Sequence, residues 1–358
     1  MGEIKKYKVG ELVVNFDRKR KPLSGRQREK MKGIYPYYGA ACIFDYINDY
    51  IFDGEYILLG EDGTVVNSDG TPVLQRISGK SWVNNHAHVL SNSEIIDFDY
   101  LYYVLKNTNF SGAVTGAVQP KISQANMNAV EVEIYEDKKD QKKVAGILKL
   151  LDEKIKLNNK INDNLLQQVF ALFDNQFSDI TAGSYSVSDY ILPKRGRGLL
   201  SKDAIKGDVP VVAGGLEPST YHNAANTVSP VITISASGAN AGFIRLWNIP
   251  VWSSDSSFID SSATDFVYFW FVLLKKRQDE IYSSQTGSAQ PHIYPQNIGS
   301  LPICELDMSE VKQYNDLVTP LFIKIGANES ENVKLAHLRD TLLPKLMTGE
   351  VDLDSLNV

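Results

Sequence analysis

The chain has 358 residues, of which 43% are apolar and 22% charged, and this composition excludes a wholly disordered or collagen-like protein. Its length predicts two domains or one large one, and its formal net charge of −6 by itself argues against a nucleic-acid partner. Two cysteines, Cys42 and Cys304, cannot build a disulfide framework, and neither a signal peptide nor an apolar run of membrane-spanning length is found, so we expect a cytoplasmic protein.

The first segment of the chain is strongly basic although the whole is acidic. Residues 5–32 contain eleven lysines and arginines against three acidic residues, and residues 33–136 are predominantly acidic. Concentrated positive charge predicts contact with a polyanion such as nucleic acid, and the alternative is a solvated, flexible loop. The residues of this segment that we expect to contact nucleic acid are Lys19, Arg20, Lys21, Arg26, Arg28, Lys30 and Lys32.

The region that follows has short apolar and aromatic runs separated by Gly, Pro, Asn and Ser, which is typical of a mixed α+β domain. A polar run in it contains Asn84, Asn85 and His86, whose side chains can bond base edges but are equally common in turns. His86 and His88 alternate on a predicted strand and so would face the same side. Further ligands for a metal are lacking, and we predict no metal site.

A long segment without proline, residues 138–176, predicts a single helix with Asp137 as its N-cap. Its apolar residues recur at spacings of three and four and form one narrow stripe. At 1.5 Å per residue, such a helix extends about 58 Å. Asn158 and Asn162 either set the register of a helix pair from within the stripe or are exposed at its edge.

The second half of the chain repeats the first. The motif Thr-Gly-x-x-Gln-Pro-x-Ile at 115–122 returns at 286–293, an offset of 171. Residues 34–39 match 208–213 at an offset of 174, and a third match near the start has an offset of 178. Several matches in the same order, with offsets that drift by a few residues, predict that the α+β domain and the long helix behind it are duplicated.

The second copy has its own basic segment at the corresponding place. The glycines that alternate with arginines in Arg195-Gly196-Arg197-Gly198 keep the backbone adaptable near a phosphate. We expect contacts with nucleic acid from Lys194, Arg195, Arg197, Lys202 and Lys206 of this segment, and from Ser253 and Asp255, which lie opposite the polar run of the first copy.

A second long helix is predicted at 309–347. Asp307 and Glu310 have the spacing of a capping box at its start, and Pro320 should kink it or divide it into two pieces. Because each apolar stripe is narrow, the simplest packing places the two long helices against each other as an antiparallel coiled coil. The predicted boundaries are 1–136 and 179–306 for the two globular domains, 137–178 and 307–350 for the helical spacers, and 351–358 for a tail.

Sequence motifs of catalysis are not found. Gly79-Lys80-Ser81 resembles the end of a phosphate-binding loop, but Leu74 occupies the position of its first glycine. Dinucleotide-binding, amino-methyltransferase and nucleophile-elbow motifs are missing as well. We therefore predict a binding protein and not an enzyme. The alternatives are a coiled-coil scaffold whose duplicated domains bind protein, and a stand-alone nuclease or methyltransferase.

Four motifs, in order over nearly the whole chain, together resemble the DNA-specificity subunit of type I restriction–modification enzymes. They are YPYYGA at 35–40, VNNHAHV at 83–89, the duplicated Thr-Gly-x-x-Gln-Pro-x-Ile, and LRDTLLPKLMTGE at 338–350. The resemblance implies two target-recognition domains that each read one half of a split target in double-stranded DNA. It also implies that the long helices set the gap between the two halves.

The resemblance further implies that the helices dock two modification subunits, which bind S-adenosylmethionine and methylate adenine. Separate restriction subunits would use ATP and Mg²⁺ to translocate and cleave the DNA, and the chain itself would bind no cofactor and hold no catalytic residue. We assign the docking of these partners to apolar residues of the helices, namely Leu151, Ile155, Leu165, Val169, Leu338 and Leu342.

The two copies differ in sequence where they should read DNA, so we predict an asymmetric target. Residues 213–215 and 235–238 follow their first-copy partners only loosely. A helical spacer of about 58 Å corresponds to roughly 17 base pairs at about 3.4 Å each. This length is the predicted upper limit on the separation of the two halves of the target.

Overall fold

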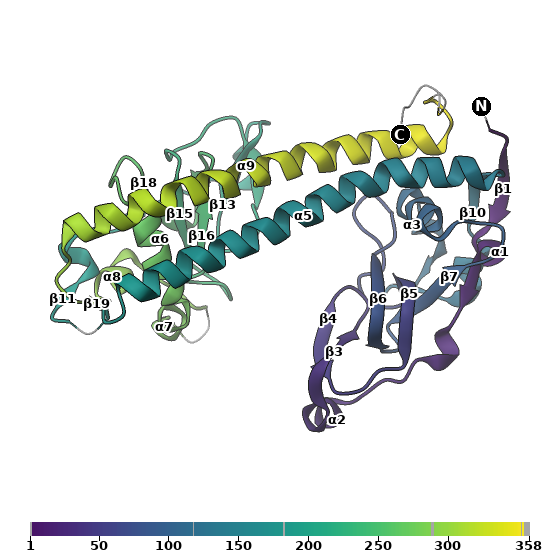
Figure 1. Ribbon diagram of the computed structural model, residues 1–358, viewed down its shortest axis with the longest axis horizontal. Coiled ribbons are helices and arrows are strands. Elements are labelled where there is room, and N and C mark those ends of the chain that lie inside the picture. The colour runs from purple at the N-terminus through teal and green to yellow at the C-terminus, as the bar shows by residue number, and fades with distance from the viewer. Residues whose placement is uncertain (1, 117, 182, 288–289, 352, 354–358) are drawn as a thin grey trace. The chain divides into compact units, whose positions relative to one another are not determined.

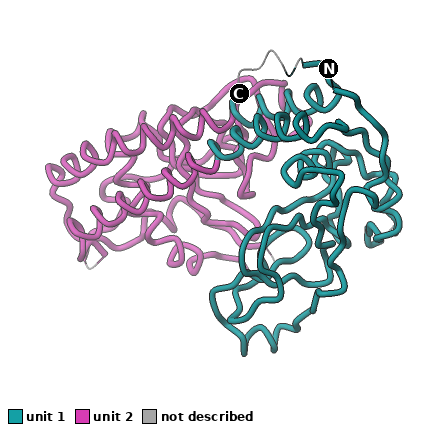
Figure 2. Tube along the Cα trace, turned by 45° about the vertical axis from the view of Figure 1, so that its right-hand side comes forward, with its two compact units in different colours: residues 1–155, 334–358 teal, residues 156–333 magenta. Residues whose placement is uncertain are grey.

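The computed structural model describes residues 2–116, 118–181, 183–287, 290–351 and 353. The chain divides into two compact parts, unit 1 (residues 1–155 with 334–358) and unit 2 (residues 156–333), as Figure 2 shows. Each unit has mixed α/β content around its own apolar core. Among the described residues, no helix combines the length and the apolar character needed to cross a membrane.

A six-stranded sheet lies at the centre of unit 1, in the order β2-β7-β5-β6-β3-β4. All neighbours pair antiparallel except β3 and β6, which are parallel. Its strands are β2 Val13–Asn15, β3 Lys32–Tyr38, β4 Ile43–Ile47, β5 Phe52–Gly60, β6 Leu74–Val83 and β7 Ala87–Asn92. Two short antiparallel pairs are added, β1 Ile4–Lys8 with β10 Glu131–Tyr135, and β8 Val114–Thr115 with β9 Lys121–Ile122.

The main core of unit 1 forms where helix α3 (Phe98–Asn107) packs on this sheet. Asp97 caps the helix, because its side chain accepts hydrogen bonds from the backbone N–H groups of Asp99 and Tyr100. Tyr100, Leu101 and Leu105 on the inner face of the helix are fully buried. Burying side chains of this size contributes about 1.5–3 kcal/mol each. The shorter helices of the unit are α1 Val9–Leu12, α2 Gly25–Lys30 and α4 Gln124–Ala129, with single turns η1 Asp17–Lys19 and η2 Ser111–Ala113.

Unit 2 contains a four-stranded sheet, β12-β18-β15-β16, and a three-stranded one, β14-β13-β17. Helix α6 (Val267–Lys276) is buried along most of its length, which agrees with its nearly unbroken apolar sequence. The strands are β11 Tyr185–Ser186, β12 Lys194–Arg195, β13 Val209–Val212, β14 Thr220–His222, β15 Val231–Ser235, β16 Ile244–Trp247, β17 Trp252–Ser253, β18 Ser256–Asp260 and β19 Pro302–Ile303. The remaining short elements are η3 Val187–Asp189, η4 Ser201–Asp203, α7 Gln278–Ser283 and α8 Pro295–Gly299.

The predicted first long helix is confirmed as α5, Lys138–Gln176, and its cap is the predicted Asp137, whose carboxylate accepts from the Lys139 N–H at 2.8 Å. The second, α9, spans Met308–Met347. The predicted division at Pro320 is wrong, because α9 continues through this residue. The carbonyl that loses its partner there belongs to Asp316, an exposed residue, so water can take the place of the missing donor.

Within each unit, the parts of α5 and α9 lie side by side (Figure 1). In unit 2 the Tyr314 hydroxyl of α9 donates to the Val169 carbonyl of α5 at 3.0 Å. In unit 1 Arg339 of α9 pairs with Asp152 of α5 at 2.5 Å. The predicted stripe of α9 is only partly buried, since Leu317, Val333 and Leu338 are 52%, 71% and 45% exposed.

Asn158 is 1% exposed and lies between the two helices of unit 2. Its amide nitrogen donates to the Glu331 carboxylate at 2.8 Å and to Asn332 at 2.9 Å. Asn328 donates in the same way to Asn162 at 2.7 Å. Of the two interpretations that the sequence leaves open, these buried bonds favour a role in fixing the register of the helices.

The same backbone pairs recur in both units. Tyr7 pairs with Val132 in unit 1, and Tyr185 pairs with Ile303 in unit 2. The Thr-Gly-x-x-Gln-Pro segments also make the same bond, from the threonine hydroxyl to the carbonyl six residues later, at 3.2 Å in unit 1 and 3.4 Å in unit 2. The sequence matches therefore coincide with matching local structures.

Candidate nucleic-acid interface

In both units a tryptophan ties the basic segment to the sheet. The indole N–H of Trp82 donates to the carbonyl oxygen of Lys21 at 2.7 Å, and that of Trp252 donates to the carbonyl oxygen of Arg197 at 2.8 Å. The two tryptophans stand at equivalent positions, on β6 paired in parallel with β3 and on β17 paired in parallel with β13. Each basic segment is therefore fixed at the same point of its unit.

Most of the predicted phosphate contacts have exposed side chains. They are Lys19, Lys21, Arg26, Lys30 and Lys32 in unit 1, and Lys194, Arg195, Arg197, Lys202 and Lys206 in unit 2. Lys32 also pairs with Asp45 at 2.8 Å, and Arg195 with Asp255 at 2.7 Å. Exposed pairs of this kind contribute only about 0–1 kcal/mol, so an incoming phosphate can compete for these two cations.

Arg28 contributes to the fold of unit 1 as well as to its positive charge. Its guanidinium donates to the Leu23 carbonyl at 2.7 Å, pairs with Asp45 at 3.3 Å, and lies over the ring of Tyr37 at 5.3 Å from the centroid. These contacts hold helix α2 against the hairpin of β3 and β4. Three interactions of Arg28 are therefore intramolecular, and its expected contact with nucleic acid stays a prediction.

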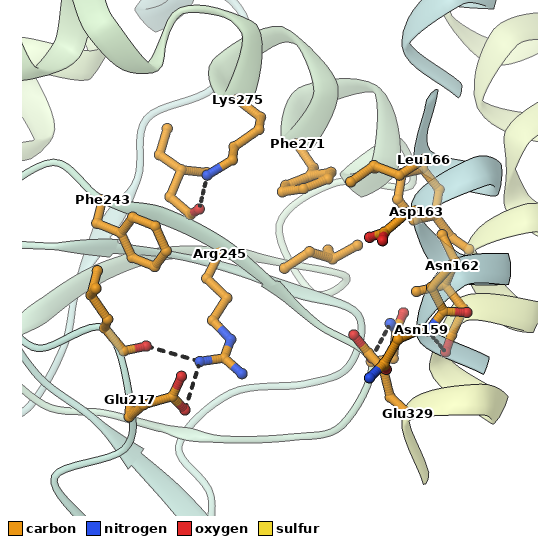
Figure 3. A pocket seen from close by; sticks show the side chains of 16 residues that line it. Asn159, Asn162, Asp163, Leu166, Glu217, Phe243, Arg245, Phe271, Lys275 and Glu329 are labelled. Carbon is orange, nitrogen blue, oxygen red and sulfur yellow. Dashed lines mark hydrogen bonds and ion pairs between the residues drawn. The ribbon is translucent and has the colours of Figure 1, made fainter. Parts of the chain in front are cut away.

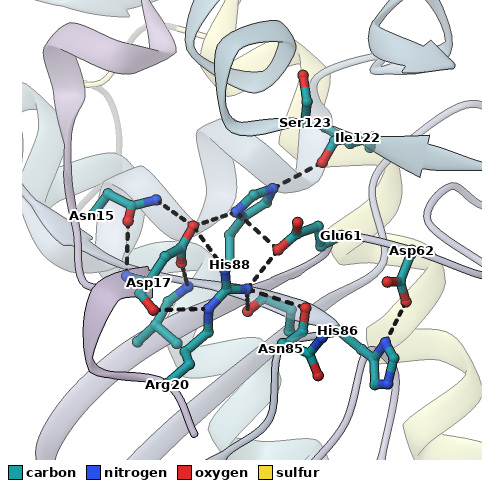
Figure 4. A network of polar contacts seen from close by, with 12 residues as sticks. Asn15, Asp17, Arg20, Glu61, Asp62, Asn85, His86, His88, Ile122 and Ser123 are labelled. Atoms are coloured by element: carbon teal, nitrogen blue, oxygen red, sulfur yellow. Dashed lines mark hydrogen bonds and ion pairs between the residues drawn. The ribbon is translucent and has the colours of Figure 1, made fainter. Parts of the chain in front are cut away.

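The prediction that Arg20 contacts nucleic acid needs correction, because its side chain is only 13% exposed and lies in a buried network (Figure 4). It donates to the Glu61 carboxylate and to the Ala87 carbonyl, both at 2.6 Å. Nearby, Nδ1 of His88 lies 2.6 Å from a carboxylate oxygen of Asp17 and Nε2 lies 2.9 Å from the Ile122 carbonyl. Both ring nitrogens of His88 thus lie within hydrogen-bond distance of an oxygen atom of the network.

The two carboxylates of the network stay ionised in the fold. Burial raises their pKa values, but hydrogen bonds outweigh it: those from His88 and from the Val89 N–H hold the pKa of Asp17 below its ordinary range. The pKa of Glu61 is lowered as well, by the Arg20 guanidinium, the charge of His88 and the bond from Lys121.

The same three side chains, Asp17, Glu61 and His88, have ligand atoms close enough together to hold a metal ion. The Arg20 guanidinium already lies against both carboxylates, at 3.5 Å from Asp17 and 2.6 Å from Glu61. A second cation there would meet a positive charge. We interpret the cluster as a structural ion-pair network that joins the basic segment, the polar run and β9.

The polar run of unit 1 is divided between the interior and the surface. Asn84 is 5% exposed, and its side-chain oxygen accepts from the His86 N–H at 2.8 Å, so it shapes the turn and does not reach a base. Asn85 is exposed, and His86 lies beside Asp62 with Nδ1 2.6 Å from the carboxylate. The prediction that His86 and His88 face one side is wrong, because β7 begins only after His86 and His88 points into the core.

The polar run of unit 2 is divided in a similar way. Ser253 is completely buried and bonds Ser256 at 2.7 Å, so its prediction as a base contact is wrong. Asp255 stays partly exposed, between Arg195 and Ser237. Sequence reasoning missed Asp62, Lys121, Ser237 and His292, although Lys121 and His292 lie at equal positions inside the repeated Thr-Gly-x-x-Gln-Pro-x-Ile motif.

The helix residues predicted to dock partners have mixed environments. Val169 is fully buried in the core of unit 2 and cannot contact another subunit. Leu165 and Leu342 are half-buried against the cores of their units, Leu151 and Ile155 are also intermediate, and Leu338 is exposed. The described side chains of α5 and α9 that offer exposed apolar surface are Leu150, Leu157, Met308, Leu317, Ile323, Val333 and Leu338.

A pocket of about 510 Å³ lies in unit 2 beside the long helices (Figure 3). Its charged side chains are largely satisfied: Arg245 donates to the Leu216 carbonyl at 2.9 Å and pairs with Glu217 at 3.3 Å. Lys275 donates to the Ile244 carbonyl at 3.0 Å, and burial lowers the pKa of its ammonium. This pocket brings together no nucleophile with a base, and we assign it no chemistry.

Three comparisons with known proteins agree with this geometry. Residues 1–167 match the family model described as the type I restriction modification DNA specificity domain. A protein of Haemophilus influenzae named as a type I restriction enzyme specificity subunit is 32% identical over 132 residues, which cover 37% of this chain and 33% of that protein. The MjaIX specificity subunit of Methanocaldococcus jannaschii is 22% identical over 314 residues, covering 72% of this chain and 70% of its own.

Thus the chain spans about a third of the Haemophilus protein and more than two thirds of the Methanocaldococcus one. The crystal structure of a type I restriction–modification S subunit from M. genitalium superposes over 97% of this chain and 96% of that one. Its TM-score is 0.60 at 18% identity, which shows a shared fold. Residues 1–167 are therefore similar to the type I restriction modification DNA specificity domain, and the fold of the chain is that of the M. genitalium S subunit.

Proposed function

We propose that this chain reads the DNA sequence for a type I restriction–modification system, with one half of a split, asymmetric target contacted by the globular part of each unit. The observation that carries the proposal is the exposed basic segment present in both units and tied to the sheet by the same tryptophan–carbonyl bond. Phosphate contacts from such segments position a protein on a duplex, and side chains beside them read base edges.

We further propose that the two globular domains arose by duplication and diverged to read different half-sites. Two observations support this proposal. Trp82 and Trp252 lie at equivalent positions of two parallel strand pairs. In both Thr-Gly-x-x-Gln-Pro segments the threonine hydroxyl bonds the carbonyl six residues later. The two units carry different side chains on these similar local structures, and different side chains are needed if the two half-sites are to differ in sequence.

The long helices, in this proposal, pair as an antiparallel coiled coil and present their exposed apolar residues to two modification subunits. In unit 2, Leu157 of α5 and Leu317, Ile323 and Val333 of α9 offer the exposed apolar surface that such docking requires. The partners would supply the chemistry, S-adenosylmethionine being bound by the modification subunits and ATP with Mg²⁺ by restriction subunits. This chain would supply recognition only.

The test is selection from a library of random duplex DNA by the full chain isolated from its host with the subunits that co-purify. We expect the selected DNA to contain two short defined sequences that are not related by symmetry. They should be separated by a gap of constant length whose bases are not specified. Retention without any sequence preference would overturn the proposal and favour a protein-binding scaffold. A palindromic sequence would overturn the asymmetric assignment.

The helical spacer has its own test. A seven-residue insertion after Ile161 in α5, matched by one in the adjoining part of α9, keeps the heptad register and lengthens the pair by about 10 Å. We expect the tolerated gap to increase by roughly three base pairs with both half-sites unchanged. A constant gap, or altered half-sites, would show that the helices do not set the spacing.

A further inference from the structure

Both units build the same backbone frame from three segments that are far apart in the sequence. In unit 1 the Glu61 N–H donates to the His86 carbonyl at 2.8 Å, and in unit 2 the Ala236 N–H donates to the Asp255 carbonyl at 3.1 Å. The donors, Glu61 and Ala236, lie just before a turn. The acceptors, His86 and Asp255, lie at the end of the polar run of their unit. These two bonds place His86 and Asp255 at equivalent positions.

The third segment joins the frame by two more bonds in each unit. Gly63 N–H donates to the Pro120 carbonyl and Gly238 N–H to the Pro291 carbonyl, both at 3.0 Å. The N–H of Ile122 bonds the carbonyl of Glu61 at 2.9 Å, and its counterpart in unit 2, Ile293 to Ala236, measures 3.0 Å. The two glycines have φ of 86° and 84°, a conformation that other residues rarely adopt, so the turns are alike as well.

The side chains carried by this common frame are different in the two units. Asp62 in unit 1 corresponds to Ser237 in unit 2, and His86 corresponds to Asp255. Lys121 corresponds to His292, because backbone bridges join Asp62 to Lys121 and Ser237 to His292. All six side chains are at least partly exposed.

The hydrogen-bonding chemistry of the two sets differs accordingly. In unit 1 Nδ1 of His86 lies 2.6 Å from Asp62, as Figure 4 shows, and Lys121 pairs with Glu61 at 3.1 Å. In unit 2 the Ser237 hydroxyl bonds Asp255, whose other oxygen accepts from Arg195 at 2.7 Å. Unit 1 therefore offers a carboxylate, a histidine and a lysine, whereas unit 2 offers a hydroxyl, a carboxylate and a histidine at the corresponding positions.

This frame also adjoins the basic segment of its unit. Arg20 of unit 1 bonds the carbonyls on either side of His86, at 3.4 Å to Asn85 and 2.6 Å to Ala87. In unit 2 the bond of Arg195 to Asp255 joins the basic segment to the frame directly. A strand of DNA held by the basic residues would therefore pass these side chains. Base readout requires a rigid backbone with donors and acceptors that vary in kind.

We propose that Asp62, His86 and Lys121 in unit 1, and Ser237, Asp255 and His292 in unit 2, are the specificity-determining residues of the two half-sites. The inference rests on the proposed function and deepens it. The backbone frame is the same in both units, whereas the hydrogen-bonding side chains on it differ. This difference explains how two similar domains read different sequences. Lys121 would donate to guanine acceptors, and Asp255 would accept from cytosine, which are the pairings that these groups favour in the major groove.

The test transfers one set of side chains onto the other frame. The full chain carrying Asp62→Ser, His86→Asp and Lys121→His is used in the same DNA selection as the wild type. We expect the half-site read by unit 1 to change by about tenfold or more in preference at one or more bases, with the other half-site unchanged. An unchanged half-site at equal affinity would overturn the inference.

Two comparisons keep this result interpretable. The exposed pair Asp53→Ser with Lys142→His makes matching changes away from the frame and should leave both half-sites unaltered. The reciprocal variant Ser237→Asp, Asp255→His, His292→Lys should change only the other half-site, and it replaces the first variant if thermal melting shows that one to be unfolded. A wild-type chain that selects no split sequence refutes the proposed function itself, whereas a split sequence that neither exchange alters refutes only the assignment of these six residues.

Discussion

The indole nitrogen of Trp82 lies 2.7 Å from the carbonyl oxygen of Lys21, and this bond ties the basic segment to strand β6 of the central sheet. The donor is on a largely buried ring and the acceptor is on an exposed residue, so the bond joins the core of unit 1 to its cationic surface. Its counterpart in unit 2 joins the half-buried ring of Trp252 to the exposed Arg197.

Two variants separate the role of this bond from that of the lysine charge. Trp82→Phe removes the donor and should lower the free energy of unfolding by about 1–2 kcal/mol, measured by urea denaturation. Lys21→Ala keeps the carbonyl, so its stability should stay within about 0.5 kcal/mol of the wild type. The slope of log affinity against log salt should fall by roughly one in Lys21→Ala and stay constant in Trp82→Phe. Equal slopes in the two variants would contradict this separation.

Charge reversal of the exposed basic residues should weaken DNA binding without unfolding the protein. Arg26→Glu and Lys30→Glu change side chains that are exposed on α2, and each should reduce both the affinity and its salt dependence. Arg28→Glu should in addition lower the melting temperature, because Arg28 bonds Leu23 and Asp45 inside the unit. If all three variants melted alike, the structural role of Arg28 would be disproved.

The carboxylate of Asp17 makes the stability of unit 1 dependent on acid pH. Its pKa is below the ordinary 3.8 in the fold and returns to about 3.9 in the unfolded chain. The stabilisation is therefore complete above about pH 4 and is lost as the pH falls through the folded pKa, because the unfolded chain binds the proton first. Urea midpoints measured between about pH 5 and 3 should fall more steeply in the wild type than in Asp17→Asn.

The surface variant Asp53→Asn is the control for this measurement and should follow the wild-type curve. Parallel curves for Asp17→Asn and the wild type would mean that the network around His88 and Arg20 does not stabilise the fold through this carboxylate.

Asn158 should be more important to the helix pair than its neighbour Asn159. Asn158→Ala removes two buried hydrogen bonds, to Glu331 and Asn332, and should cost about 1–3 kcal/mol. Asn159 is exposed and accepts one bond from Asn332, so Asn159→Ala should cost less than about 1 kcal/mol. Chemical denaturation of both variants decides the matter, and equal losses would remove Asn158 from its register-setting role.

The two long helices were accessible to sequence reasoning because their signals are local. Apolar spacing of three and four, and the carboxylate of Asp137 at the start, act within a few residues of one another, and α5 begins and ends where they predict. The interruption expected at Pro320 failed for a reason that no local pattern contains, namely that the orphaned carbonyl is on the exposed side of α9.

The repeat, the basic segments and the family resemblance could be read from residue order alone, because each is a property of that order. Which of these side chains are available for contacts depends on the folded structure. Arg20, Asn84 and Ser253 are polar and belong to the right motifs, yet they are buried, since a polar group can satisfy its hydrogen bonds inside the fold as well as with DNA. Asp62, His86 and Lys121 are brought together by backbone bonds between segments as far as about 60 residues apart, and such long-range pairing cannot be inferred from local spacing.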